Sequence, residues 1–148
     1  MRYLLVDRIT DVEPGSKITG VKNVAMSEDF LEFHFPKNPI MPGIMLLEAL
    51  VQLTGWLEAV SSDFKKWFLV STVLKCSFYG FVIPGDRVEL SVSCGPAPSK
   101  DLVVYGGIAK VNGKRRLKAE FQGSLVDLET IEEVEEQKKF FEILKRGV

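Results

Sequence analysis

Apolar and polar residues alternate along two long parts of this chain, which flank one stretch that is apolar almost throughout. The alternation is typical of β-strands, which we expect over residues 4–12, 17–24, 68–82, 86–94, 102–111 and 115–126. The apolar stretch runs from Pro42 to about Val60 and has the length of a helix. Together these elements predict an α+β fold, in which an antiparallel sheet packs on one long central helix.

Turn-forming residues separate the predicted strands. Pro14-Gly15 lies between the first two strands, Pro84-Gly85-Asp86 precedes the fourth, and Asn112-Gly113 is a strong signal of a two-residue hairpin. Pro42 suits the first position of a helix, because its missing N–H has no partner there in any case. We therefore expect an extended loop that ends at Met41, directly before the central helix.

The segment from Asp127 to Val148 is rich in charge, and we expect it to form a helical extension that follows the main domain of residues 1–126. Its charges change from acidic to basic along the chain, which matches the helix dipole, and Thr130 to Glu133 has the form of a capping box. An apolar stripe would pack on the sheet or on a second subunit. The stripe consists of Leu128, Ile131, Val134, Phe141 and Leu144.

Composition favours one small globular domain. The chain has 148 residues, 46% of them hydrophobic, and its net charge of −1 gives no general attraction to nucleic acid or an anionic membrane. We found no apolar run close to the ~20 residues that span a bilayer, and no signal peptide, so we expect a cytoplasmic protein without a membrane span. Cys76 and Cys94 lack the spacing of metal ligands and are expected to stay reduced; neither a metal nor a cofactor is predicted.

The candidate chemistry lies where the loop meets the helix. His34 is the only histidine, and an imidazole can accept or release a proton near neutral pH. Glu48 stands among aliphatic residues of the helix, so its carboxyl group must be paired, protonated or exposed in a cleft. The two residues suggest acid/base chemistry on an apolar substrate, whereas either residue alone would be read as structural.

Gly43 and Gln52 complete the candidate site. The N–H groups of a first helical turn have no acceptor within the helix and lie at the positive end of its dipole, so Gly43 could bind a developing oxyanion. A glycine there could equally serve close packing. Gln52 follows Glu48 by four residues and shares its helix face, where the amide could orient the carboxylate.

The motif H-F-P-x-x-P-x-x-P-G at residues 34–43, followed by L-x-E-A-L-x-Q at residues 46–52, resembles the hot-dog-fold 3-hydroxyacyl-acyl carrier protein dehydratases of fatty acid synthesis. Weaker matches, such as Tyr3 to Arg8 and Val82 to Asp86, extend the likeness over about residues 1–126. The resemblance implies a single hot-dog domain whose sheet wraps the central helix. It also implies an acyl carrier protein as partner and a homodimer, or a trimer of dimers.

Position by position, the resemblance implies that His34 and Glu48 are catalytic, with the Gly43 N–H polarising a thioester carbonyl and Gln52 steadying Glu48. It further implies that the histidine and the glutamate of one site come from opposite subunits. In this hypothesis His34 removes a proton from C2 of a (3R)-3-hydroxyacyl thioester. Glu48, whose pKa we expect its apolar neighbours to raise, protonates the departing C3 hydroxyl to give a trans-2-enoyl thioester and water.

Some positions depart from the family pattern. Phe33 and Lys37 stand where the family usually has glycine, and the run from Lys75 to Phe81 carries fewer basic residues than usual. Two alternatives therefore stay open, a thioesterase and a non-catalytic acyl-binding homologue.

The basic residues near the last hairpin are interpreted as solvated charges; they are Lys110, Lys114, Arg115, Arg116 and Lys118. Acyl chain length, carrier protein versus coenzyme A, and any isomerase activity are not set by these patterns.

Overall fold

The computed structural model describes residues 3–147 and contains every strand and helix that the sequence predicts. The long elements are, in chain order, β1 (Arg8–Glu13), β2 (Lys17–Asn23), α1 (Gly43–Ser61), β3 (Lys66–Phe78), β4 (Arg87–Cys94), β5 (Val103–Val111), β6 (Lys114–Asp127) and α2 (Val134–Lys145). Two short 3₁₀ turns, η1 (Asp29–Leu31) and η2 (Leu128–Thr130), lie between them.

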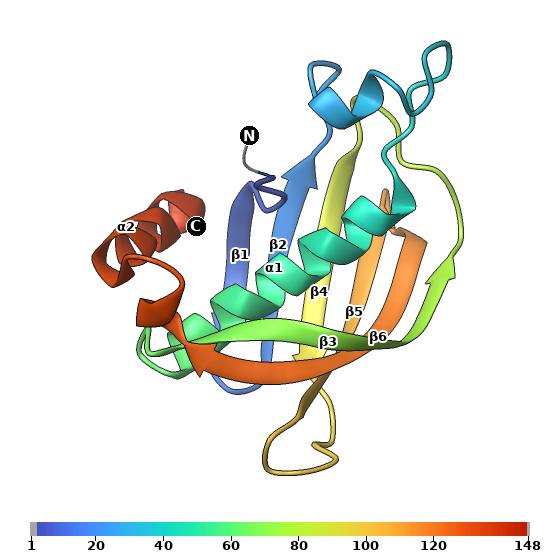
Figure 1. Ribbon diagram of the computed structural model, residues 1–148. Helices are drawn as coiled ribbons and strands as arrows, with labels where there is room; N and C mark the ends of the chain where they lie inside the picture. The colour runs from blue at the N-terminus through green and yellow to red at the C-terminus, as the bar shows by residue number, and fades with distance from the viewer. Residues whose placement is uncertain (1–2, 148) are drawn as a thin grey trace.

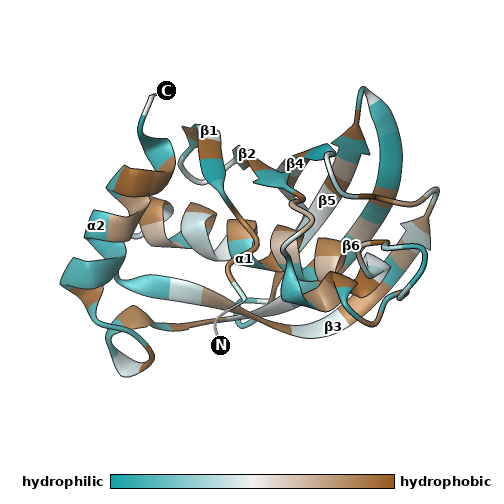
Figure 2. Cartoon of the chain, turned by 90° about the horizontal axis from the view of Figure 1, so that it is seen from above, coloured by the Kyte–Doolittle hydropathy of each residue, from teal (hydrophilic) through white to brown (hydrophobic). Residues whose placement is uncertain are grey.

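The six strands form one antiparallel sheet in the order β1-β2-β4-β5-β6-β3. The sheet curves round α1, which lies along its concave side with β1 and β3 at the two edges (Figure 1, Figure 2). A buried row at helical spacing faces the sheet from α1, and it consists of Leu46, Leu50, Leu53 and Leu57. This is the hot-dog arrangement expected from the resemblance.

The central helix is more apolar than the sequence expectation allowed. By length and composition alone, α1 could cross a membrane, since it has 19 residues and a mean hydropathy of 1.4 over its most apolar window. However, 56% of that window is buried inside the fold. Burial by the curved sheet therefore accounts for the apolar character of this helix. The sheet also approaches closely, because a Cβ at Gly55 would lie 2.3 Å from the Trp67 ring.

Two segments that we predicted as strand are not strand. Residues 4–7 lie before β1, and residues 79–82 follow β3. In each segment a backbone group has another partner, because Leu5 N–H donates to Gln52 Oε1 (2.9 Å) and the Val82 carbonyl accepts from Met41 N–H (2.8 Å). The prediction failed because these partners are distant in sequence, and both contacts bear on the candidate site.

The predicted hairpin between β5 and β6 is confirmed. Asn112 and Gly113 both have positive φ, 50° and 78°, which a two-residue type I′ turn requires. Lys114 then pairs with Val111 in the antiparallel ladder.

The predicted capping box at the start of the last helix is wrong. The Thr130 hydroxyl donates to the Asp127 carbonyl (2.6 Å) and so belongs to the turn η2, while the helix α2 begins only after Glu133. Ile131 is also exposed and is not part of the packed stripe. The acidic-to-basic trend survives, since Glu135 and Glu136 lie in the first turn of α2 and Lys145 in its last.

The helix α2 packs against β1 and the second half of α1 (Figure 1). Phe141 and Leu144 are buried in the main core, and Trp56 of α1 meets the rings of Phe140 and Phe141. The expected packing of this extension on the main core is therefore confirmed, and its role stays a prediction. A boundary between domain and extension at residues 126 and 127 stays a prediction.

Candidate active site

His34 lies in the loop between β2 and α1, and hydrogen bonds hold the loop closed around it. Ile40 N–H donates to the His34 carbonyl (2.8 Å), and His34 Nδ1 lies 2.8 Å from the Ile40 carbonyl oxygen. A carbonyl oxygen can only accept, so Nδ1 carries a proton, and in the neutral form of the ring this fixes the tautomer. Nε2 is then left with its lone pair and is the nitrogen available to take a proton.

A pocket of about 530 Å³ opens beside the imidazole. His34 and Gly43 contribute to its wall, and the remaining lining is almost entirely apolar. That lining includes Ile40, Met41, Ile44, Leu46, Phe78, Phe81 and Val82. Phe33 is not part of the wall and is 77% exposed, so the change from the usual family residue does not narrow this pocket within one chain.

Phe78 and Phe81 line this pocket, whereas the sequence left their place open between the core, an interface and an acyl-binding surface. They lie at the end of β3 and just after it, and both are exposed to the pocket and solvent. Their signal was an aromatic run beside a glycine, which also fits a core strand. Phe78 reaches the pocket from the last paired position of β3, and Phe81 from the segment that has left the sheet.

Gly43 is the first residue of α1, one position later than the expected helix start, with Pro42 as the N-cap. A Cβ built on it would lie 2.5 Å from Phe78 Cε1, so the exposed Phe78 ring would have to shift to admit any side chain. Gly43 therefore has a close-packing role beside Phe78. The first-turn N–H still lies at the positive end of the helix dipole and at the pocket wall, so the oxyanion role stays a prediction.

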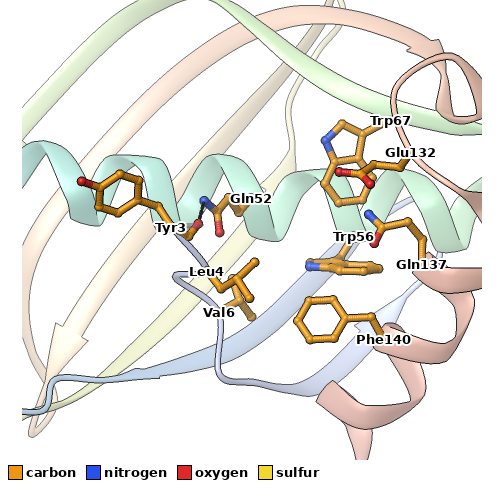
Figure 3. A pocket seen from close by; sticks show the side chains of 9 residues that line it. All are labelled: Tyr3, Leu4, Val6, Gln52, Trp56, Trp67, Glu132, Gln137 and Phe140. Carbon is orange, nitrogen blue, oxygen red and sulfur yellow. Dashed lines mark hydrogen bonds between the residues drawn. The ribbon is translucent and has the colours of Figure 1, made fainter. Parts of the chain in front are cut away.

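Gln52 is hydrogen-bonded to Glu48, as its spacing on the helix suggested. Its Nε2 donates to Glu48 Oε1 (3.0 Å) and to the Tyr3 carbonyl (2.8 Å), and its Oε1 accepts from Leu5 N–H (2.9 Å). Figure 3 shows the Gln52 side chain beside the Tyr3 backbone, at the edge of a smaller pocket lined by Trp56 and other residues. The backbone contacts define which end of the amide faces Glu48, so a donor is directed at the carboxylate.

Glu48 does not share a pocket with His34 within one chain. It is exposed and is not part of the 530 Å³ pocket wall. Its own chain therefore does not supply the apolar enclosure that we expected around this carboxyl group. A site containing both residues needs a second surface to cover Glu48.

The described residues 3–147 contain no group of three or more His, Cys, Asp or Glu side chains arranged to hold a metal ion. Both cysteines are free thiols. Burial raises the pKa of the Cys76 thiol, and burial together with the nearby Glu58 carboxylate raises the pKa of Cys94. Fewer thiolates form in consequence, which makes both cysteines weak nucleophiles.

The curved sheet around a helix, with an imidazole pocket at the start of that helix, defines a hot-dog-fold protein equipped for acid/base chemistry. The FabA-like domain model matches residues 1–120, and the chain belongs to this family.

Curated relatives cover most of the chain. It is 42% identical over 119 residues to the 3-hydroxyacyl-[acyl-carrier-protein] dehydratase FabZ of Thermoanaerobacter sp. (strain X514), covering 80% of this chain and 83% of that protein. It is 38% identical over 129 residues to the protein of the same name from Myxococcus xanthus (strain DK1622), covering 84% and 83%.

Solved structures share the fold at low sequence identity. The dehydratase heterocomplex ApeI:P from Xenorhabdus doucetiae has a TM-score of 0.60 at 14% identity, covering 77% of this chain and 92% of that one. The smu.793 protein from Streptococcus mutans UA159, bound to acetyl CoA, has a TM-score of 0.63 at 13% identity, covering 81% and 88%. These matches support the architecture alone.

Proposed function

We propose that this protein is a 3-hydroxyacyl-acyl carrier protein dehydratase, a hydro-lyase acting in fatty acid or related acyl-chain synthesis. The observation that carries the proposal is the His34 loop, in which Nδ1 is bonded to the Ile40 carbonyl and the imidazole lines an apolar pocket at the amino-terminal end of α1. The names of the relatives specify the same reaction class. We also place the protein in the cytoplasm, with the substrate carried on acyl carrier protein.

The reaction is an elimination that needs one base and one acid. Nε2 of His34 takes the C2 proton of the 3-hydroxyacyl thioester, and the electron pair of that C–H bond forms the C2–C3 double bond. The C3–O bond breaks as Glu48 gives its proton to the leaving hydroxyl, which departs as water. The negative charge that builds on the thioester oxygen during proton removal is met by the N–H of Gly43.

The proposed site is shared between two subunits. Glu48 is exposed and lies outside the pocket of its own His34, so a partner must enclose it. The strand β3 offers a surface for this partner, since it is 13 residues long, lies at the sheet edge and exposes apolar side chains. These side chains are Leu69, Val70, Val73, Leu74 and Phe78. We propose a homodimer that covers this edge.

The function is tested by incubating the purified protein with (3R)-3-hydroxyacyl thioesters on acyl carrier protein and on coenzyme A. Formation of the 2-enoyl thioester, followed by its ultraviolet absorbance, is the expected result. Release of a free thiol without enoyl product would identify a thioesterase. Binding of the substrate without either product would identify a non-catalytic acyl-binding protein.

Two substitutions of Gly43 separate its packing role from its proposed oxyanion role. Gly43→Ala and Gly43→Pro both place a Cβ against Phe78, and proline is tolerated at the first position of a helix, but only proline removes the N–H. We expect kcat of the proline variant to fall roughly 100-fold below that of the alanine variant, as for loss of one oxyanion donor. Equal kcat values for the two variants would leave Gly43 with a packing role alone.

A further inference from the structure

Lys22 is a buried lysine that the proposed reaction does not use. It lies on β2 with only 3% of its surface exposed, between apolar neighbours of the sheet. Its Nζ lies 2.6 Å from Glu28 Oε1 and 3.4 Å from Asp7 Oδ2. A buried ammonium group is stable only when it is paired, and here one ammonium joins two carboxylates from two different segments of chain.

The contact with Glu28 connects Lys22 to the loop that carries His34. Glu28 opens the turn η1, where its carbonyl accepts from Leu31 N–H (3.1 Å), and the Leu31 side chain is buried. His34 follows three residues later. The carboxyl-terminal side of the loop is held by the bond from Met41 N–H to the Val82 carbonyl. The amino-terminal side is held by the Lys22–Glu28 contact together with the backbone bonds of Val24 to Gly85 and Asp86.

The contact with Asp7 connects Lys22 indirectly to Glu48, through the amino-terminal segment and Gln52. Asp7 Oδ2 also accepts from Asn23 N–H (2.7 Å), which ties the amino-terminal segment, residues 3–7, to the end of β2. The same segment supplies the two backbone groups that orient Gln52, and Gln52 donates to Glu48. In Figure 1 the amino-terminal segment and the loop that carries η1 lie at the same end of the sheet, where β2 ends.

We propose that Lys22 is a positioning residue that sets the orientation of both His34 and Glu48 through these two carboxylates. This inference rests on the proposed function. Because the two catalytic groups of one chain would serve different sites of the dimer, each Lys22 supports one half of each site. The ammonium touches neither substrate nor reacting atoms, so its loss should alter geometry while leaving the pocket wall in place.

The test compares Lys22→Met with the wild type by steady-state kinetics and by amide hydrogen exchange. We expect kcat to fall roughly tenfold or more with KM changed by less than about twofold, since small misplacements of catalytic groups act on turnover. Exchange should become faster in residues 24–42 and in residues 3–7, and stay unchanged in β4 and β5. Normal kcat per folded molecule would overturn the proposal.

Variants of Glu28 and Asp7 measure the effect of each contact separately. They also test the proposal if Lys22→Met does not fold. Glu28→Ala should speed exchange only in residues 24–42, and Asp7→Ala only in residues 3–7. Glu28→Gln keeps an oxygen that accepts from the ammonium and should retain kcat within about threefold of the wild type. Equal kcat loss in Glu28→Gln and Glu28→Ala would contradict positioning through this contact.

The control lies on the same strand. Lys17→Met removes the ammonium of an exposed ion pair with Glu13 (3.2 Å) and should leave both kinetics and exchange unchanged. The exchange measurement also separates this inference from the proposed function. If the wild type performs no dehydration, unchanged exchange in Lys22→Met would still refute the positioning role, and faster exchange in both segments would still support it.

Discussion

His34→Ala is expected to lower kcat for dehydration by roughly 10²- to 10⁴-fold, the usual contribution of a positioned general base. The geometry gives the reason, because the Ile40 carbonyl holds the proton on Nδ1 and leaves only Nε2 to accept the C2 proton. Alanine provides no base at the pocket wall. Turnover of a 3-hydroxyacyl thioester, followed by enoyl absorbance, measures the effect.

The matched control for this variant is Phe33→Ala. Phe33 precedes His34 in the same loop, but its side chain is exposed and is not part of the pocket wall, so its removal should change kcat by less than about threefold. Size-exclusion chromatography and thermal melting should match the wild type for both variants. If His34→Ala retained full activity, His34 would have no part in proton transfer.

The positions of the strands along the chain and the central helix could be predicted because local signals agreed. The alternation of residues, the proline before α1 and the Asn112-Gly113 turn each act over a few positions, and nothing elsewhere in the chain opposes them. The two false strand predictions occurred where a backbone group bonds to a distant segment, whereas the capping box failed through a local bond from Thr130 to Asp127. In residues 79–82 the Val82 carbonyl accepts from Met41 in the His34 loop, and no periodicity of the sequence indicates such a bond.

In the candidate site, too, local contacts could be predicted and contacts between distant segments could not. The pairing of Gln52 with Glu48 could be predicted, since a separation of four residues on a helix brings side chains together. The two bonds that orient the amide could not, because they come from Tyr3 and Leu5 at the other end of the domain. Lys22 was missed for a similar reason, since its partners are identified only by the fold.

Replacement of the proposed general acid, Glu48, is the second change expected to lower kcat strongly. Glu48→Gln keeps the size of the side chain and an oxygen for the Gln52 amide, but it cannot protonate the departing hydroxyl. We expect kcat to fall roughly 10²- to 10⁴-fold with the fold and oligomer size unchanged. Activity near the wild-type level would exclude Glu48 as the general acid.

Mixing the two inactive variants tests whether the site is shared between subunits. If His34 of one subunit works with Glu48 of its partner, a heterodimer of His34→Ala and Glu48→Gln has one site with both defects and one intact site. Random exchange of equal amounts makes half of the dimers mixed, so about a quarter of wild-type activity should return. If both residues of a site came from one chain, every site would keep one defect. No activity would then return, once exchange is verified with differently tagged subunits.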